Sequence, residues 1–163
     1  MDSPPDSPPA TPPARAGHDL FDGPGEARAL CRALDWAATP LGPPEGWSPT
    51  LRAVVRACLE SPFPINLWCG PARVLLYNDG YRRALGAKHP WALGRAGAEV
   101  WAEIWPELAP MFARVDAGEP PVYAEDAPFV MERADGGGSE TAWFTFGLSA
   151  VRDEAGAVVA YLN

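Results

Sequence analysis

The stretch TAWFTFGLSAV, residues 141–151, carries the alternation that decides the fold. Apolar side chains recur at every second position, which places them together on one face of an extended strand. One face would carry Ala142, Phe144, Phe146 and Leu148, and the other would carry Trp143, Thr145, Gly147 and Ser149. The pattern predicts a β-strand that buries one side against a core.

Further strands are expected on both sides of this stretch. After it, RDEAGA (152–157) is typical of a tight turn. VVAYLN (158–163) then begins a final strand, and because a domain rarely stops in mid-strand we expect this domain to be truncated there. Before it, VYAEDAPFVMER (122–133) is one extended run that we expect to kink at Pro128, and ADGGGSE (134–140) is the connecting turn.

An earlier hairpin and a set of short helices complete the main domain. INLWC (65–69) and RVLLYN (73–78) are two short strand-like runs with a Gly-Pro turn between them. Short helices are expected between this hairpin and the later strands, and the last of them has four apolar residues at helical spacing: Leu108, Met111, Phe112 and Val115. This order predicts an α+β fold, with an antiparallel sheet covered on one face by helices.

Two segments precede the main domain, which we place at residues 61–163. Residues 1–25 contain six prolines within their first thirteen positions and predict a disordered tail. Residues 26–60 predict a helical extension with two amphipathic helices. Their apolar faces need burial, either against the sheet or in a dimer seam. The candidate interface residues are Leu30, Leu34, Leu51, Val54 and Val55.

Four segments give the chain a family resemblance: LDWAATPLGPPEGWSPTLRAVV (34–55), LLYNDGYRRALGAKHPWALGR (75–95), EVWAEIW (99–105) and WFTFGLSAVRDEAGAVV (143–159). In this order and spacing the sequence resembles PAS domains at the N-terminus of bacterial sensor histidine kinases and hybrid histidine kinases. The resemblance implies a five-stranded antiparallel sheet with helices on one face. It also implies a cytoplasmic, non-catalytic input domain that senses a ligand or dimerises, and passes a signal to a C-terminal kinase or other output domain.

Charge and composition exclude several function classes. The net charge is -8, and between residues 98 and 140 ten acidic residues stand against two basic ones, so a nucleic-acid backbone would be repelled. The sequence has no apolar stretch long enough for a membrane helix and no secretory signal. The three cysteines, Cys31, Cys58 and Cys69, are too far apart for a metal motif and are expected to be buried thiols.

The chemistry expected of particular cofactors and of a phospho-acceptor is missing from the relevant segments. The resemblance would place a flavin-reactive cysteine within residues 78–118 and a haem-ligating histidine within residues 108–118, and neither is there. We therefore predict no flavin adduct, no haem and no metal. Neither His18, beside the tail, nor His89, which precedes a proline, suits a phospho-acceptor helix.

A ligand cavity remains the main functional hypothesis. Ten residues are candidates for its lining: Leu67, Tyr77, Tyr81, Trp101, Met111, Val115, Phe129, Met131, Phe144 and Phe146. Such a lining suits a small apolar or aromatic ligand. The alternative is that these side chains simply fill the core of a ligand-free dimerisation module. A third hypothesis is a small α+β enzyme that uses Glu99, Glu103 and Glu107, spaced to share one helical face, as acid and base.

Overall fold

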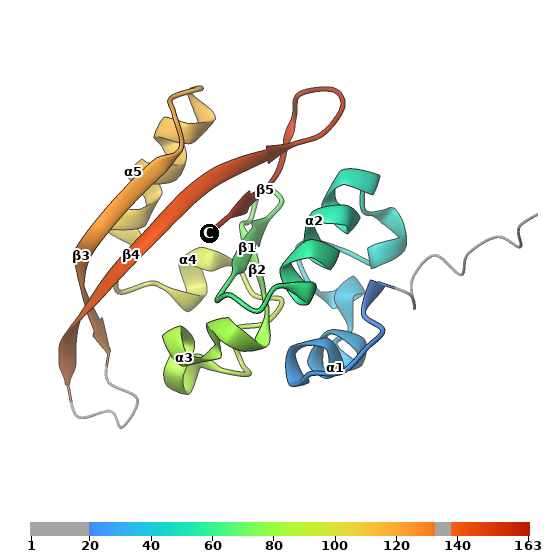
Figure 1. Cartoon of the computed structure of the whole chain (residues 1–163), viewed down its shortest axis with the longest axis horizontal. Helices are drawn as coiled ribbons and strands as arrows, with labels where there is room; N and C mark the ends of the chain where they lie inside the picture. The colour runs from blue at the N-terminus through green and yellow to red at the C-terminus, as the bar shows by residue number, and fades with distance from the viewer. Residues whose placement is uncertain (1–19, 133–137) are drawn as a thin grey trace, which may run out of the picture.

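The sheet is the centre of the molecule. A computed structural model describes residues 20–132 and 138–163, and in these residues five strands form one antiparallel sheet in the order β2-β1-β5-β4-β3 (Figure 1). The strands are β1 (Asn66–Cys69), β2 (Val74–Tyr77), β3 (Val122–Glu132), β4 (Ser139–Arg152) and β5 (Val158–Leu162). The predicted α+β class with a five-stranded antiparallel sheet is confirmed.

The last strand in sequence lies in the middle of the sheet. β5 pairs with β1 through Leu67 and Leu162, and with β4 through Ala150 and Tyr161. The first hairpin, β1–β2, therefore joins the long β3–β4 hairpin only through β5. Residues from both halves of the chain meet at this central strand, which makes the sheet a single unit.

The β3–β4 hairpin contains a bulge that the sequence did not locate. The register shifts between Ala124 and Ala127, where Asp126 adopts a positive φ of 48° and donates its backbone N–H to the Thr145 hydroxyl at 3.1 Å. Pro128, where the kink was expected, stays in register opposite Trp143. Proline is tolerated there because β3 is an edge strand and needs no donor on its free side. The predicted turn at 134–140 lies mostly outside the described residues.

Short helices cover one face of the sheet, here called the inner face. They follow β2 in the order η4 (Asp79–Tyr81), α3 (Arg82–Leu85), η5 (Gly86–Lys88), α4 (Gly97–Val100) and α5 (Trp105–Asp116). Phe112 of α5 packs on Trp68 of β1 and Tyr161 of β5, with ring centroids 5.1 and 4.9 Å apart. Alternation along β1 then turns Leu67 and Cys69 toward the opposite, outer face.

The outer face is covered by α2 (Pro49–Glu60), which contacts β1, β2, β5 and β4 (Figure 1). The preceding helix α1 (Glu26–Ala33) is joined to α2 by the ion pair of Arg28 with Glu60. α2 begins as the sequence predicts, because the Ser48 hydroxyl accepts from the Leu51 backbone N–H at 3.2 Å and Pro49 occupies the first turn. Between the two helices lie the short turns η2 (Trp36–Ala38) and η3 (Pro44–Gly46).

The five residues predicted for a dimer seam differ in their burial. Leu51 and Val55 are only 5% and 0% exposed inside the core of their own chain. Leu30, Leu34 and Val54 pack against the same core. α2 therefore buries Leu51 and Val55 within its own chain, whereas Leu30, Leu34 and Val54 stay partly exposed, and a dimer contact at these three remains a prediction.

The packed part of the chain also begins earlier than predicted. Leu20 and Phe21 are buried although they fall within the expected tail. The Phe21 ring stacks on Trp36 at 5.7 Å, and Trp36 meets Trp47 edge-on at 5.0 Å. The proline-rich composition of residues 1–25 concealed that Leu20 and Phe21 belong to the hydrophobic core. Residues 1–19 lie outside the described part of the chain.

Asn78 ties the two layers together at the end of β2. Its amide oxygen accepts from the backbone N–H groups of Ile65 and Tyr81, both at 3.1 Å. Its amide nitrogen lies within hydrogen-bond distance of the carbonyls of Cys58, Ser61 and Phe63. A buried asparagine with this many partners holds the end of α2, the start of β1 and the turn η4 in one arrangement, as the expected capping role implies.

Candidate functional site

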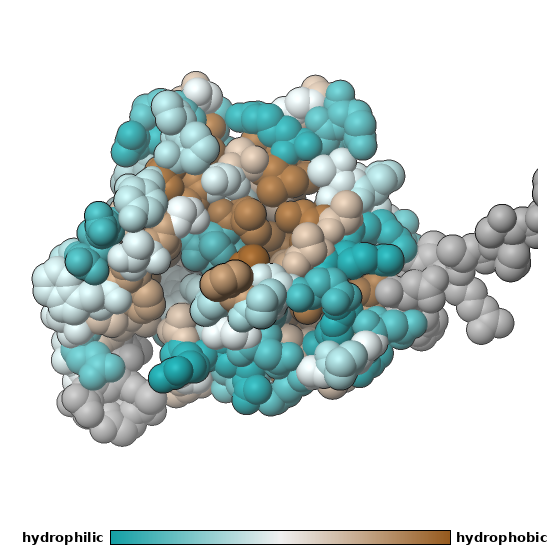
Figure 2. All heavy atoms as spheres, viewed as in Figure 1, coloured by the Kyte–Doolittle hydropathy of each residue, from teal (hydrophilic) through white to brown (hydrophobic). Residues whose placement is uncertain are grey.

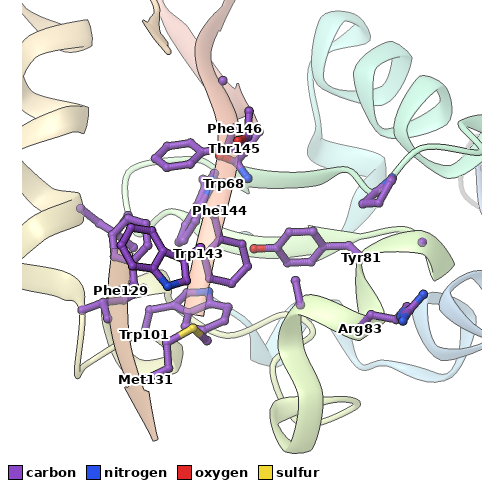
Figure 3. A pocket seen from close by; sticks show the side chains of 17 residues that line it. Trp68, Tyr81, Arg83, Trp101, Phe129, Met131, Trp143, Phe144, Thr145 and Phe146 are labelled. Atoms are coloured by element: carbon purple, nitrogen blue, oxygen red, sulfur yellow. The ribbon is translucent and has the colours of Figure 1, made fainter. Parts of the chain in front are cut away.

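A cavity of about 800 Å³ lies between the inner face of the sheet and the short helices (Figure 3). In a view of the whole surface, hydrophobic side chains gather at the middle of one face and the surface is hollowed beside the β3–β4 hairpin (Figure 2). The lining residues are Pro64, Trp68, Gly80, Tyr81, Arg83, Ala84, Trp101, Ile104, Leu108, Phe129, Met131, Trp143, Phe144, Thr145, Phe146, Gly147 and Asn163.

Strand alternation explains the aromatic wall of the cavity. Phe144 and Phe146 lie two residues apart on β4, and Phe129 of β3 packs on both rings at 6.0 Å. Met131 follows Phe129 by two residues and so faces the same side. This wall therefore follows from the alternation in residues 141–151 and from its pairing with β3.

Six of the ten predicted lining residues do line the cavity: Tyr81, Trp101, Phe129, Met131, Phe144 and Phe146. Four do not. Leu67 points to the outer face, because its neighbour Trp68 takes the inner one. Tyr77 is turned toward His89, with its hydroxyl 2.9 Å from Nδ1. Met111 and Val115 lie one and two turns along α5 from Leu108, the residue of that helix that reaches the cavity.

The sequence analysis missed several lining residues, and Trp68 is the most informative of them. The register of the β1–β2 hairpin decides which face Trp68 occupies, and the short runs at 65–69 and 73–78 carry no alternation from which to read it. Both strands are buried on both sides, so every position looks apolar. Ile104 and Leu108 were missed because the helix start at Trp105 lies after a stretch that is only partly helical.

The lining residues carry few polar groups, and two of these groups are closed off from the cavity. The indole Nε1 atoms of Trp68 and Trp101 are buried, and no described residue accepts a hydrogen bond from either. Burial raises the pKa of the Tyr81 hydroxyl, so the phenol stays protonated at neutral pH. Asn163 donates from its side-chain amide to Asn66 Oδ1 at 2.7 Å. Among the described lining residues none is acidic.

The three cysteine thiols and the imidazole of His89 do not line the cavity. Cys31, Cys58 and Cys69 are buried and free, as expected, and none of them is a lining residue. Desolvation raises the pKa of the Cys31 and Cys58 thiols to about 12. His89 bridges Tyr77 and Glu26 Oε1, the latter at 3.0 Å from Nε2. In residues 20–132 and 138–163 no cluster of histidine, cysteine and carboxylate side chains could hold a metal ion.

The carboxylates proposed as an acid–base pair are separated. They do not share one helix, because Glu99 belongs to α4, Glu107 to α5, and Glu103 to the segment between them. Glu99 pairs with Arg95 at 2.7 Å, and Glu103 pairs with Lys88 at 2.9 Å. None of the three lines the cavity. The geometry that the enzyme hypothesis requires, two carboxylates facing one cleft, is absent here.

No helix in the described parts of the chain is both long and apolar enough to cross a membrane. This agrees with the absence of a long apolar run in the sequence.

Comparison with known proteins gives limited similarity. No protein-family profile matches the chain, and no curated protein is similar to it. A solved structure described as an RNA-binding Light-Oxygen-Voltage receptor shares 26% sequence identity with this chain, and the two structures superpose with a TM-score of 0.48. The similarity covers 77% of this chain and 35% of that one, so this chain spans about a third of the receptor's length.

Proposed function

We propose that this chain is a sensory PAS input domain of a bacterial signalling protein, and that it binds a small ligand in the cavity on its inner face. The single observation that carries the proposal is the cavity itself, about 800 Å³ and walled by aromatic side chains. Small-molecule sites typically have volumes of about 300–1,000 Å³ and mostly apolar walls with a few polar groups. Protein interiors otherwise contain few voids larger than a water molecule.

The plain-core alternative accounts less well for this geometry. If Phe129, Phe144 and Phe146 served only to fill the interior, they would close on the helices opposite. Instead Phe129 packs on the other two rings at 6.0 Å, and Phe144 and Phe146 stay partly exposed beside the cavity although α5 contacts β4. Filling the space with a ligand restores the contacts that the aromatic wall lacks on its free side.

A residue that lines the cavity and also bonds to a central strand could carry the proposed signal from the ligand to the sheet. Asn163 follows β5, lines the cavity and bonds to Asn66 of β1, the two residues also exchanging backbone hydrogen bonds of 2.9 and 3.0 Å. A ligand that binds one arrangement of this pair more tightly than another shifts the population toward it. We propose that a C-terminal histidine kinase or similar output domain responds to that shift, without a covalent step on a thiol, a haem or a bound metal.

A cavity-filling variant tests ligand binding. Ala84→Phe places a ring in the cavity from α3, and Ala87→Phe places the same ring on an exposed site that does not line it. Thermal unfolding is measured on each protein as purified from cells and again in the presence of a small-molecule library. We expect a ligand to raise the unfolding temperature of the wild type and of Ala87→Phe but not that of Ala84→Phe. Met131→Trp, from the opposite wall, guards against a folding defect specific to Ala84→Phe. Ligand sensing would be refuted if the wild type and the two filled variants showed the same thermal shift with every compound.

A dimerisation role is favoured by one further observation. Of the five large hydrophobic residues that are exposed in the described parts of the chain, three belong to the β3–β4 hairpin: Tyr123, Val130 and Trp143, at 70, 58 and 65% exposure. Trp143 also borders the cavity, whereas Tyr123 and Val130 do not. α1 and α2 do not cover this end of the sheet (Figure 1). We propose that a second copy of the chain packs here, because a solvated apolar strip of this kind marks an interaction surface.

Light scattering after size exclusion tests the dimer. Tyr123→Lys, at a residue that does not line the cavity, is expected to shift the protein from dimer to monomer, whereas Phe63→Lys, at an equally exposed hydrophobic residue elsewhere, leaves the dimer intact. A wild type that is monomeric at every concentration tested would refute this surface as a self-association site and would leave ligand binding unaffected.

A further inference from the structure

The tyrosine hydroxyls in and beside the core differ in their hydrogen bonds. The Tyr77 hydroxyl lies 2.9 Å from His89 Nδ1, and the Tyr161 hydroxyl donates to Asp116. The Tyr81 hydroxyl has no partner among the described residues, where the hydrogen bond of Tyr81 is made by its backbone N–H. Of these three tyrosines, only Tyr81 lines the cavity.

The Tyr81 hydroxyl opens into the cavity. Tyr81 is partly exposed, and its hydroxyl points from η4 toward the labelled aromatic side chains of β4 (Figure 3). The indole N–H groups of Trp68 and Trp101 also lack acceptors among the described residues, but packing closes them off from the cavity. A bound molecule can therefore reach the phenol of Tyr81, whereas it cannot reach these two indole nitrogens.

Two other polar side chains of the lining already have partners within the fold. The Thr145 hydroxyl accepts from the Asp126 backbone N–H at 3.1 Å, and the Asn163 amide donates to Asn66 Oδ1 at 2.7 Å. A phenol carries one proton to donate, and no described residue accepts the proton of Tyr81. An acceptor on a ligand would satisfy it.

The position of the Tyr81 hydroxyl is fixed by the turn that carries it. The Tyr81 backbone N–H donates to Asn78 Oδ1 at 3.1 Å, and the Tyr81 ring packs on the Tyr77 ring with centroids 6.2 Å apart. The preceding Gly80 lies so close to Pro64 that an added Cβ would stand 3.1 Å from its nitrogen. Because this arrangement exists before a ligand arrives, little conformational freedom is lost on binding.

The charges around the cavity favour an uncharged ligand. Burial raises the pKa of the Tyr81 hydroxyl, and the same loss of solvation penalises a charge on a bound molecule. Among the described lining residues no carboxylate is present to pair with a cation. Arg83 is exposed and points away from the labelled aromatic side chains, so an anion among those rings would lack a partner (Figure 3).

We propose that the cavity binds an uncharged aromatic molecule whose carbonyl oxygen accepts a hydrogen bond from the Tyr81 hydroxyl. This inference rests on the proposed ligand-sensing function and names the class of ligand. The aromatic part lies against Phe144 and Phe146, and the oxygen faces η4. The rings of the wall attract any aromatic molecule of suitable size, whereas the hydroxyl selects the ketone over a hydrocarbon of the same shape.

Three probes of nearly one shape test this class. They are 2-acetylnaphthalene, which is uncharged and has the acceptor, 2-isopropenylnaphthalene, which lacks it, and 2-naphthoate, which has acceptors and a negative charge. Affinities for the wild type are measured by titration calorimetry. One hydrogen bond predicts that the ketone binds roughly 3- to 10-fold more tightly than the hydrocarbon. We expect naphthoate to bind more weakly than the ketone because its charge is desolvated.

Tyr81→Phe removes the hydroxyl and keeps the ring. We expect this variant to bind the hydrocarbon as the wild type does and to lose the preference for the ketone. Tyr77→Phe is the matched control, because its hydroxyl is bonded to His89 and does not line the cavity, and it should retain the preference. Ala84→Phe, which fills the cavity, should bind the ketone and the hydrocarbon much more weakly than the wild type does.

The carbonyl carbon of the ketone gives a direct readout that needs no variant. With ¹³C at this carbon, the resonance of the bound ketone should lie downfield of its position in hexane for the wild type and for Tyr77→Phe. In Tyr81→Phe it should return toward the hexane value. This measurement decides the question even if Tyr81→Phe folds poorly.

The outcomes separate the ligand class from ligand sensing. The class would be overturned, and the cavity left as a ligand site, if the hydrocarbon or naphthoate bound the wild type as tightly as the ketone. A ketone preference that survived in Tyr81→Phe would overturn it equally. Undiminished binding to Ala84→Phe would place the probes outside the cavity and refute the inference. If no probe bound the wild type, the class would be wrong, and the thermal-shift screen would still decide whether a ligand binds.

Discussion

The hydroxyl of Tyr77 lies 2.9 Å from Nδ1 of His89, and this contact continues outward through His89 Nε2 to Glu26 Oε1 at 3.0 Å. A core residue of β2 is thereby connected to the first turn of α1, across 63 residues of sequence between Glu26 and His89. Arg82 adds an ion pair to Glu26 at 2.8 Å. The chain of contacts fastens the N-terminal helix to the sheet and gives His89 a structural role.

Glu26 should make stability fall in acid. The hydrogen bond from His89, and then the charge of Arg82, hold the pKa of this carboxyl below its ordinary value. A group whose pKa is lowered by folding contributes stability above its unfolded pKa of about 4.3 and loses it as pH falls through the folded value. We expect the free energy of unfolding of the wild type to exceed that of Glu26→Gln at neutral pH and the difference to shrink below about pH 4. A difference that grows on acidification would contradict this assignment.

Asn78 should be among the most sensitive polar residues to substitution. Asn78→Ala leaves two backbone N–H groups and three carbonyls without this side chain, and we expect a loss of about 3 kcal/mol in urea unfolding. Asp35 accepts only one exposed hydrogen bond, from Ala37 N, so Asp35→Ala should cost less than about 1 kcal/mol. Similar losses for the two variants would argue against Asn78 as the tie between the layers.

Gly97 is required by a close approach to Trp68. A Cβ atom at Gly97 would lie 2.7 Å from Trp68 Cζ3 and 3.0 Å from the Arg73 carbonyl oxygen. Gly97→Ala should therefore destabilise the fold by about 1–3 kcal/mol and displace the Trp68 indole. Gly46→Ala is the matched control, because nothing lies within 4 Å of the added carbon. If Gly97→Ala has the unfolding temperature of the wild type and an unchanged Trp68 indole resonance, the close approach of Gly97 to Trp68 does not limit the residue at position 97.

The three cysteines should be unreactive while the protein is folded. Desolvation raises the pKa of the Cys31 and Cys58 thiols to about 12 and raises that of Cys69 as well. Because the thiolate is the nucleophile, a thiol reagent at about pH 8 should modify none of them in the native state and all three after denaturation. Rapid labelling of any one cysteine in the folded protein would show that its site opens locally.

The sequence predicted well where burial is one-sided. The alternation in residues 141–151 was enough to place Phe144 and Phe146 in the cavity wall, and Ser48 with Pro49 was enough to start α2. It predicted poorly where burial is two-sided, since the register that sends Trp68 inward and Leu67 outward is set by hydrogen bonding between strands. The same limit applies to Tyr77, which the sequence placed in the cavity wall.

Long-range contacts account for the remaining differences. Helical spacing at Leu51 and Val55 identified an apolar face but not what covers it, and that is decided by the position of α2 on the sheet. The burial of Leu20 and Phe21 depends on Trp36 and Trp47, which meet them only in three dimensions. The two unpaired indoles likewise become visible only when every possible acceptor around them has been placed.

On the outer face α2 packs closely on β1, β2 and β5, whereas the inner face borders open space. The closely packed side can hold the fold while residues around the open space change in size and polarity, because those changes remove few of the contacts on which folding depends. Related sequences that kept the outer packing and varied at the partly exposed Tyr81, Phe144 or Phe146 would change the specificity of the proposed ligand site on an unchanged scaffold. Recognition in this architecture is therefore free to diverge faster than stability.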